Sequence, residues 1–177
     1  MSYSRRTFFR SLFSHAGAAL GVLMLPLTFA RSAGAAESDA SSLPDFDKWQ
    51  KLSEDDWATR LTAEQFYVLR EEGTERAFTS SLNEEKRKGT FHCAGCELSL
   101  FSSDAKYDSG TGWPSFLTPI NEAHIGTSTD FRLFLPRTEV HCARCLGHLG
   151  HVFEDGPAPT GLRYCINGLA LAFHPAA

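Results

Sequence analysis

The pattern of apolar and polar positions changes character three times along the chain. An apolar stretch from about Leu12 to Ala30 gives way to a polar stretch, and helical features follow. After Gly89, short aromatic and β-branched segments alternate with Gly, Pro, Asp and Ser. Short segments separated by turn residues are typical of a small antiparallel β domain. We therefore predict a mainly β fold with N-terminal helices that cover it.

Two helix starts precede the β part. Ser53 is followed by three acidic residues, which suit the first turn of a helix. Thr62–Gln65 fits the capping-box pattern, and the helix that it opens carries Phe66 and Leu69 three positions apart. Gly73 is the expected end of this second helix.

Six strands are predicted after the helices. They span Thr90–Cys93, Phe131–Leu135, Thr138–His141, His151–Phe153, Leu162–Asn167 and Leu169–Phe173. The charged run Glu84–Lys88, which precedes them, is expected to be a solvated loop or a helix end.

The first 36 residues have the layout of an export signal. Ser4–Arg10 contains paired arginines, the apolar stretch follows, and Ala33–Ala36 offers small residues for cleavage. The paired arginines indicate the Tat route and hence the periplasm. An uncleaved membrane anchor is the alternative. Glycine and proline residues interrupt the apolar stretch, so we expect cleavage near Ala35 or Ala36.

The rest of the chain suits one acidic domain. We predict a flexible leader at residues 37–52 and a folded domain at 53–177. The signal holds four arginines and no acidic residue, so 13 basic and 21 acidic residues remain, a net charge of −8. Because nucleic-acid binding relies on basic surface, we expect no nucleic-acid partner. We expect the protein to be a monomer.

Four of the five cysteines form two C-x-x-C pairs, Cys93 with Cys96 and Cys142 with Cys145. In such a pair the two-residue spacer lets both sulfurs converge on one ion, and four thiolates favour one structural zinc per chain, with iron as the usual mimic. Disulfides are the alternative in an exported protein. Tat cargo folds before export, which weakens that alternative.

Cys165 is the cysteine left over. If Leu162–Asn167 is a strand, Arg163, Cys165 and Asn167 share one face, because side chains alternate along a strand. A cation beside a thiol lowers the thiol pKa and favours the thiolate. The alternative is an inert, buried cysteine. The polar flanks of Cys165 favour a reactive one.

Two other segments carry candidate chemistry. His148 and His151 can bind metal, act as acids or be solvated, and beside a nucleophilic thiol they are natural proton donors. The glycine-rich turn at Gly110–Phe116 presents Trp113, which can hold an apolar group of a substrate or pack in the core. Thr111 and Phe116 of this turn join Trp113 as predicted substrate-binding residues.

Together these segments resemble the methionine-R-sulfoxide reductase B family, over roughly residues 55 to 173. The matching segments are Gly73–Glu75, Cys93–Cys96, Tyr107–Phe116, Arg137–Val140, Cys142–Cys145, His148–Phe153, Asp155–Pro157 and Pro159–Asn167. Several motifs in the right order make the resemblance specific.

The resemblance implies a zinc-braced pair of antiparallel sheets and reduction of the R epimer of methionine sulfoxide, mainly in oxidised proteins. It implies that Cys165 is the nucleophile and that Trp113 holds the sulfoxide methyl group. His148 and His151 then assist protonation of the sulfoxide oxygen. Arg163 and Asn167 support the thiolate and the bound substrate.

The chain departs from the family at two places. Many members carry a resolving cysteine where this chain has Thr111, so a thioredoxin-like protein or a small thiol is the expected reductant. Asn167-Gly168-Leu169 replaces a commoner continuation, without an expected effect on chemistry. Two other functions are weighed against the reductase: a zinc-ribbon binding module, which has no use for Cys165, and a thiol-disulfide exchanger, which would use the C-x-x-C pairs without metal.

Overall fold

The structure is a computed structural model that describes residues 43–132 and 135–177. The expected export signal at residues 1–36 and the first residues of the expected leader lie outside the described residues. None of the helices in these two ranges has the length and hydrophobicity that a membrane span requires.

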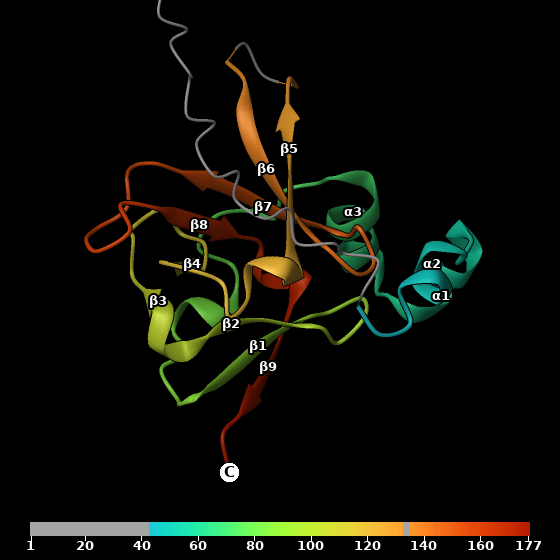
Figure 1. Ribbon diagram of the computed structural model, residues 1–177, viewed down its shortest axis with the longest axis horizontal. Coiled ribbons are helices and arrows are strands. Elements are labelled where there is room, and N and C mark those ends of the chain that lie inside the picture. The colour runs from blue at the N-terminus through green and yellow to red at the C-terminus, as the bar shows by residue number, and fades with distance from the viewer. Residues whose placement is uncertain (1–42, 133–134) are drawn as a thin grey trace, which may run out of the picture. The chain divides into compact units, whose positions relative to one another are not determined.

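Three short helices lie together beside the sheets (Figure 1). They are α1 (Phe46–Gln50), α2 (Glu54–Arg60) and α3 (Ala63–Glu71). The two predicted helix starts are confirmed: Ser53 forms a capping box with Asp56, and Thr62 forms one with Gln65. Each box satisfies backbone N–H groups that the first helical turn leaves without a partner. Helix α3 ends two residues before Gly73.

Helix α1 lies inside the segment that we predicted as a flexible leader, and this corrects the prediction for residues 43–52. Leu43 is buried, and the Trp49 ring stacks on Trp57 of α2 with centroids 5.8 Å apart. The side-chain amide of Gln50 donates to the backbone carbonyl of Arg144 at 2.7 Å. Apolar burial and a long-range hydrogen bond therefore attach this segment to the domain.

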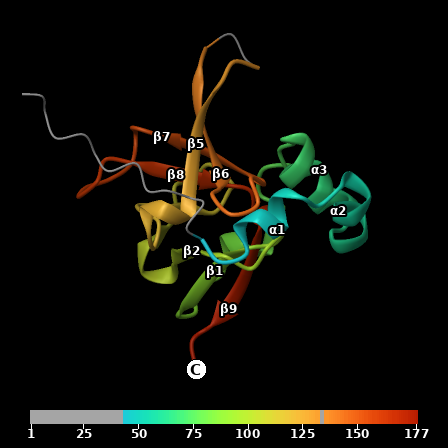
Figure 2. The same cartoon turned by 45° about the vertical axis from the view of Figure 1, so that its right-hand side comes forward.

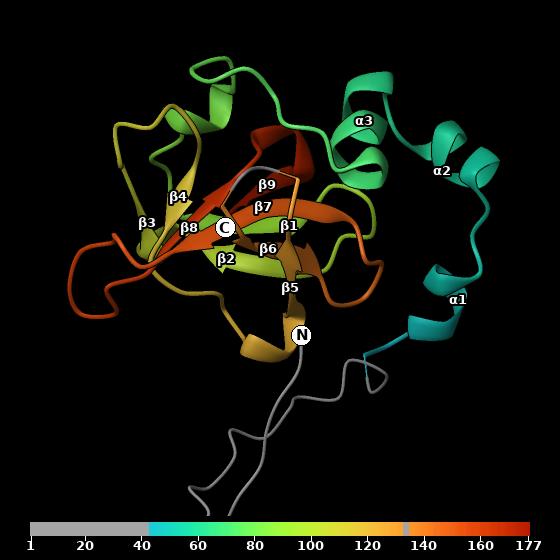
Figure 3. The same cartoon turned by 90° about the horizontal axis from the view of Figure 1, so that it is seen from above.

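Two antiparallel sheets contain the nine strands of the described residues (Figures 2 and 3). The smaller sheet has the order β2-β1-β9, with β1 (Gly89–Cys93), β2 (Ser99–Ser102) and β9 (Leu171–Pro175). The larger has the order β3-β4-β8-β7-β6-β5, with β3 (Lys106–Tyr107), β4 (Ser115–Phe116), β5 (Ile125–Asp130), β6 (Arg137–Cys142), β7 (His148–Phe153) and β8 (Arg163–Ile166). Short 3-10 turns lie at Ser81–Asn83, Ser103–Ala105, Glu122–His124 and Gly168–Ala170. The predicted mainly β class is confirmed.

One predicted strand is wrong in its described part. Strand β5 ends at Asp130, where the carboxylate accepts a hydrogen bond from the backbone N–H of Arg132 at 2.8 Å and closes a turn. Phe131, Arg132 and Leu135 are therefore not in a strand, and residues 133–134 lie outside the described ranges. The charged run Glu84–Lys88 is a loop, as predicted.

An aromatic cluster fills the space between the sheets. The rings of Phe91 and Phe101, from the small sheet, lie 5.0 and 4.4 Å from the Phe116 ring of β4. Phe116 has no exposed surface, so it is a core residue, and its predicted role in substrate binding is corrected. Tyr164 and Ile166 of β8 are also buried. The opposite face of β8 is therefore the one that carries Arg163 and Cys165, as the alternation predicts.

Candidate active site and metal centre

The two C-x-x-C pairs form matching turns at strand ends. Cys93 is the last residue of β1 and Cys142 the last of β6. In the first turn the N–H of Glu97 donates to the Cys93 carbonyl at 2.8 Å, and in the second the N–H of Leu146 donates to the Cys142 carbonyl at 2.9 Å. The same backbone turn thus presents two sulfurs at the tip of each hairpin.

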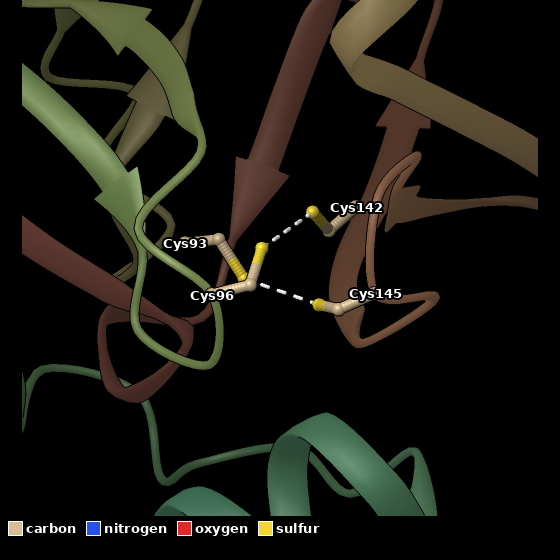
Figure 4. Close-up of side chains that lie close together, drawn as sticks. All are labelled: Cys93, Cys96, Cys142 and Cys145. Atoms are coloured by element: carbon tan, nitrogen blue, oxygen red, sulfur yellow. Dashed lines mark hydrogen bonds between the residues drawn. The ribbon is translucent and has the colours of Figure 1, made fainter. Parts of the chain in front are cut away.

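The four sulfurs converge on one point (Figure 4). Cys93 Sγ lies 3.6 Å from Cys145 Sγ, Cys96 Sγ lies 3.5 Å from Cys142 Sγ, and all four atoms lie within 4.8 Å of one another. A tetrahedral zinc with Zn–S bonds of ~2.3 Å has sulfurs about 3.8 Å apart. The four side chains are buried, and all five cysteines of the chain are free. The donor set fits a structural zinc.

A zinc ion held by these four cysteines would join the two sheets. The first C-x-x-C turn connects β1 to β2 in the small sheet, and the second connects β6 to β7 in the large sheet. Helix α2 covers the site, since a Cβ added at Gly95 would lie 3.4 Å from the Trp57 ring. The two C-x-x-C pairs lie 45 residues apart in the sequence because each belongs to a hairpin of a different sheet.

Cys165 lies apart from these four, in the middle of a row of side chains across the outer face of the large sheet. Its cross-strand partners are Ser115 in β4 and His151 in β7. The row continues from His151 to Glu139 in β6 and to Ser128 in β5. Cross-strand partners on one face have neighbouring Cβ atoms, so the thiol belongs to one row of polar side chains that crosses five strands, with Ser115 and His151 directly beside it.

A pocket of about 110 Å³ opens over Cys165. Its lining comes from Thr74, Trp113, Arg137, Gly150, His151, Phe153, Cys165 and Asn167. Gly150 allows β7 to approach β8 closely here, because a Cβ at this position would lie 2.1 Å from the Cys165 carbonyl oxygen. The pocket places aromatic rings and an imidazole around one half-buried thiol.

The protonation state of Cys165 differs from our expectation. Burial raises the pKa of the Cys165 thiol, and the lowering effects of Thr111 and Arg163 do not offset it. The Arg163 guanidinium makes two hydrogen bonds of 2.8 Å to Asp155 and stacks on Phe153 at 4.4 Å. Because a carboxylate already neutralises Arg163, the predicted shift of Cys165 toward the thiolate is corrected for the free enzyme.

Each active-site histidine has a carboxylate partner. His148 Nδ1 lies 2.8 Å from Glu139 Oε1, and His151 Nε2 lies 2.8 Å from Asp130 Oδ2. Burial lowers the pKa of His151, while its hydrogen bond with Asp130 acts in the opposite direction. The two imidazole rings meet edge to face with centroids 5.4 Å apart. Only His151 of the two lines the Cys165 pocket.

Hydrogen bonds from Arg132 and His151 keep the Asp130 carboxylate ionised. The backbone N–H of Arg132 is the strongest influence that lowers the Asp130 pKa, and the His151 bond follows it. The pKa of Glu139 is lowered in the same way, mostly by its hydrogen bond with His141 and next by the one with His148. Both histidines therefore face carboxylates that stay negatively charged at neutral pH.

Asn167 lines the pocket but has both ends of its amide engaged. Its Oδ1 accepts from the backbone N–H of Glu75 at 3.0 Å, and its Nδ2 donates to the Leu149 carbonyl at 3.0 Å. Glu75 in turn accepts bonds from two backbone N–H groups, those of Gly168 and Leu169, at 2.6 and 3.0 Å. The amide therefore holds the pocket wall in place.

Glu75 also positions the tryptophan. Its backbone carbonyl accepts the indole N–H of Trp113 at 3.2 Å. This buried residue was not among our candidates, although it stands in a segment that matches the family. Thr74, Arg137 and Glu139 were also not among our candidates, although they too stand in matching segments. Asp130 carried no such signal.

Thr111 lies beside the thiol, with its hydroxyl oxygen 3.9 Å from Cys165 Sγ. The hydroxyl also lies 2.8 Å from that of Ser109, which lies 2.7 Å from that of Ser115. A chain of hydroxyl groups thus leads to the side of Cys165 opposite His151. A cysteine at position 111 would lie close to Cys165. This is the position at which many members of the resembled family carry a resolving cysteine.

Comparisons with known proteins give a consistent result. Residues 61–175 match the family described as the SelR domain. The chain is 53% identical over 121 residues to a peptide methionine sulfoxide reductase MsrB of Leptospira interrogans, covering 68% of this chain and 92% of that protein. It is 54% identical over 121 residues to the MsrB of Methanosarcina mazei, covering 68% and 86%. It is also 45% identical over 166 residues to a chloroplastic reductase B1 of Arabidopsis thaliana, covering 89% and 82%.

Proposed function

We propose how this chain, which belongs to the methionine-R-sulfoxide reductase B family, reduces methionine sulfoxide. The protein is an oxidoreductase that reduces methionine sulfoxide in proteins and uses thiol reductants. The observation that carries the mechanism is the pairing of Cys165 with His151 across β8 and β7, inside one pocket.

Cys165 is the proposed nucleophile. Its sulfur attacks the sulfoxide sulfur, the S–O bond of the substrate breaks, and a new S–O bond forms on Cys165. Two electrons pass from the cysteine to the substrate, so methionine leaves and Cys165 becomes a sulfenic acid. The thiol proton ends on the transferred oxygen, which balances the step.

His151 is the proposed proton carrier. Its hydrogen bond to the Asp130 carboxylate places a proton on Nε2 and leaves Nδ1 able to accept another. Because Cys165 has a raised pKa and His151 a lowered one, both start neutral at neutral pH. The thiol proton can then pass to His151 and on to the sulfoxide oxygen. The Asp130 carboxylate stabilises the imidazolium between the two transfers.

The other groups hold substrate and protein. Trp113 offers an aromatic face to the sulfoxide methyl group, with its indole fixed by Glu75. Glu139 fixes the ring of His148, which packs against His151. The four clustered cysteines would hold a zinc ion that supplies structural bracing between the sheets. No step of the reaction is assigned to that ion.

Recycling requires an external thiol. Thr111 at 3.9 Å offers no thiol, and the other four cysteines form the metal centre. A first thiol attacks the sulfenic sulfur, giving a mixed disulfide and water. A second thiol releases Cys165 and a disulfide. A thioredoxin-like protein or a small thiol supplies both.

The activity is tested by single turnover of reduced protein with each epimer of a blocked methionine sulfoxide. We expect one methionine per Cys165 from the R epimer and none from the S epimer. Equal reduction of both epimers, or turnover that survives the loss of Cys165, would contradict the proposal.

We further propose that residues 1–36 export the folded enzyme through the Tat route to the periplasm, where it repairs oxidised envelope proteins. The paired arginines Arg5 and Arg6 support this. Replacing both with lysine in the full chain should leave the protein in the cytoplasm and uncleaved. Unchanged export of that variant would contradict the route.

A further inference from the structure

Two side pockets adjoin the Cys165 pocket. One, of about 220 Å³, shares Trp113 with it and includes Phe78; we name it the Phe78 pocket. The other, of about 230 Å³, shares Thr74, Arg137 and His151 with it and includes Phe131; we name it the Phe131 pocket. Because each side pocket shares wall residues with the Cys165 pocket, the three hollows lie side by side, and we call the row that they form the depression. A single methionine sulfoxide side chain leaves both ends unused.

Each end of the depression carries an exposed aromatic side chain. Phe78 is 74% exposed and Phe131 is 75% exposed. Isolated exposed apolar residues are common on protein surfaces. These two, however, line pockets that continue a reactive site, where exposed aromatic rings are typical of ligand contacts.

The backbone of Phe78 is held in an uncommon conformation. Its φ is +65°, in the left-handed region that side chains other than glycine rarely adopt. Its N–H donates to the Gly112 carbonyl at 2.8 Å, and Asn83 donates to the same carbonyl at 3.0 Å. Gly112 has φ +93°, and a Cβ there would lie 2.8 Å from the Phe78 ring. The ring is thus fixed against the loop that carries Trp113, yet remains open to solvent.

The charges at the Phe78 end of the depression disfavour an acidic occupant. The Phe78 pocket contains two carboxylates, Glu84 and Asp108, and one ammonium group, Lys106. That ammonium group already donates to the Asn83 carbonyl at 2.8 Å. The whole chain carries a net charge of −4. Neutral and apolar groups therefore suit this end of the depression better than acidic ones.

We propose that the depression binds an extended segment of the oxidised protein, and that Phe78 packs against an apolar side chain two positions from the methionine sulfoxide. This inference rests on the proposed function. In an extended chain the side chains two positions from the central residue point to the same face and lie ~6.6 Å away along the strand, which places them over the side pockets. Phe78 is then a specificity-determining residue: it selects apolar side chains at that position, and the carboxylates of its pocket disfavour acidic ones.

The test compares blocked pentapeptides of the sequence Xaa-Gly-MetO-Gly-Xaa, with the R-sulfoxide and with leucine, glycine or aspartate at both Xaa positions. N-acetyl methionine-R-sulfoxide methylamide is the small reference substrate. With the wild-type enzyme, we expect kcat/KM to fall from leucine to glycine to aspartate, with about a 5- to 10-fold step from leucine to glycine. In Phe78→Ala the leucine-to-glycine ratio should fall to about one, through a higher KM for the leucine peptide.

Two variants make the result specific. Phe78→Tyr keeps the aromatic face and should keep the preference. Ile120→Ala removes an apolar side chain that is 45% exposed and lines none of the three pockets, so it should leave the ratio at the wild-type value. A wild-type enzyme without preference, or a Phe78→Ala variant that keeps it, would overturn the inference. If the wild-type enzyme does not reduce the small substrate at all, the proposed function itself is overturned.

Discussion

The four clustered cysteines and Cys165 carry the same side chain in two opposite environments. The four lie at the tips of two hairpins, where their nearest partners are one another's sulfurs at 3.5 and 3.6 Å. Cys165 lies mid-strand in a polar row, beside an imidazole and a hydroxyl group and under a pocket. Position on the sheet therefore separates two kinds of thiol: convergent turns bring four sulfurs within metal-binding distance, and a strand under a pocket presents a single thiol, which suits the proposed nucleophile.

The two environments can be tested by the same cysteine-to-serine substitution in each. Cys165→Ser should lower turnover of methionine-R-sulfoxide at least about 1000-fold, because a hydroxyl group is a far weaker nucleophile than a thiol. Its zinc content and melting temperature should match those of the wild type, as Cys165 touches no metal ligand. Steady-state kinetics and metal analysis measure both. Substantial turnover without Cys165 would place the chemistry elsewhere.

The matched substitution in the four-cysteine cluster should instead change zinc content and stability. Cys142→Ser removes one of four converging ligands, so zinc should be lost and the folded state destabilised by several kcal/mol, which lowers Tm by about 10–20 °C. Thermal unfolding and metal analysis, with Cys165→Ser as the control, give the comparison. Full zinc content and an unchanged Tm would mean that these cysteines do not form a metal site.

A smaller effect is expected from the carboxylate behind His151. Asp130→Asn keeps the size of the side chain but removes its charge, so His151 should stabilise an added proton less well. We expect kcat to fall about 10- to 100-fold with little change in KM. Asp104→Asn, which alters an acid paired with Lys88 outside the site, is the control. Equal kcat for both variants would remove Asp130 from the mechanism.

The smallest effect concerns the pH dependence of Cys165. Because burial raises its pKa, the thiolate fraction at neutral pH is small. The rate of alkylation by iodoacetamide should therefore keep rising at pH values above the ordinary pKa of a free cysteine. Thr111→Val removes a contact that lowers this pKa, so the midpoint should move further up. Mass spectrometry follows alkylation at Cys165 alone. A plateau near neutral pH would show a thiolate at rest and contradict the assignment.

Local signals in the sequence predicted the parts of the structure that depend on neighbours in the chain. The helix starts at Ser53 and Thr62, the two C-x-x-C turns, and the alternation of Arg163 and Cys165 are all such features. The strand β5 was missed: Ile125–Asp130 has four small or polar residues in its interior, so no apolar alternation marks it.

The remaining differences come from contacts between distant segments. Asp130 reaches His151 only because β5, β6 and β7 pair in one register, which no local pattern encodes. Phe116 is buried rather than substrate-facing because it pairs with Tyr164 on the core side of the sheet. Cys165 has a raised pKa because burial outweighs an arginine that Asp155 already neutralises.

The division between four cysteines for metal and one for chemistry is tested most directly by one single-turnover experiment. Reduced, zinc-loaded protein receives one equivalent of methionine-R-sulfoxide with dimedone present and is analysed by mass spectrometry and metal analysis. We predict a dimedone adduct on Cys165, none on the other four cysteines, and one zinc retained per chain. A disulfide between Cys165 and Cys93, Cys96, Cys142 or Cys145, with zinc released, would contradict the account.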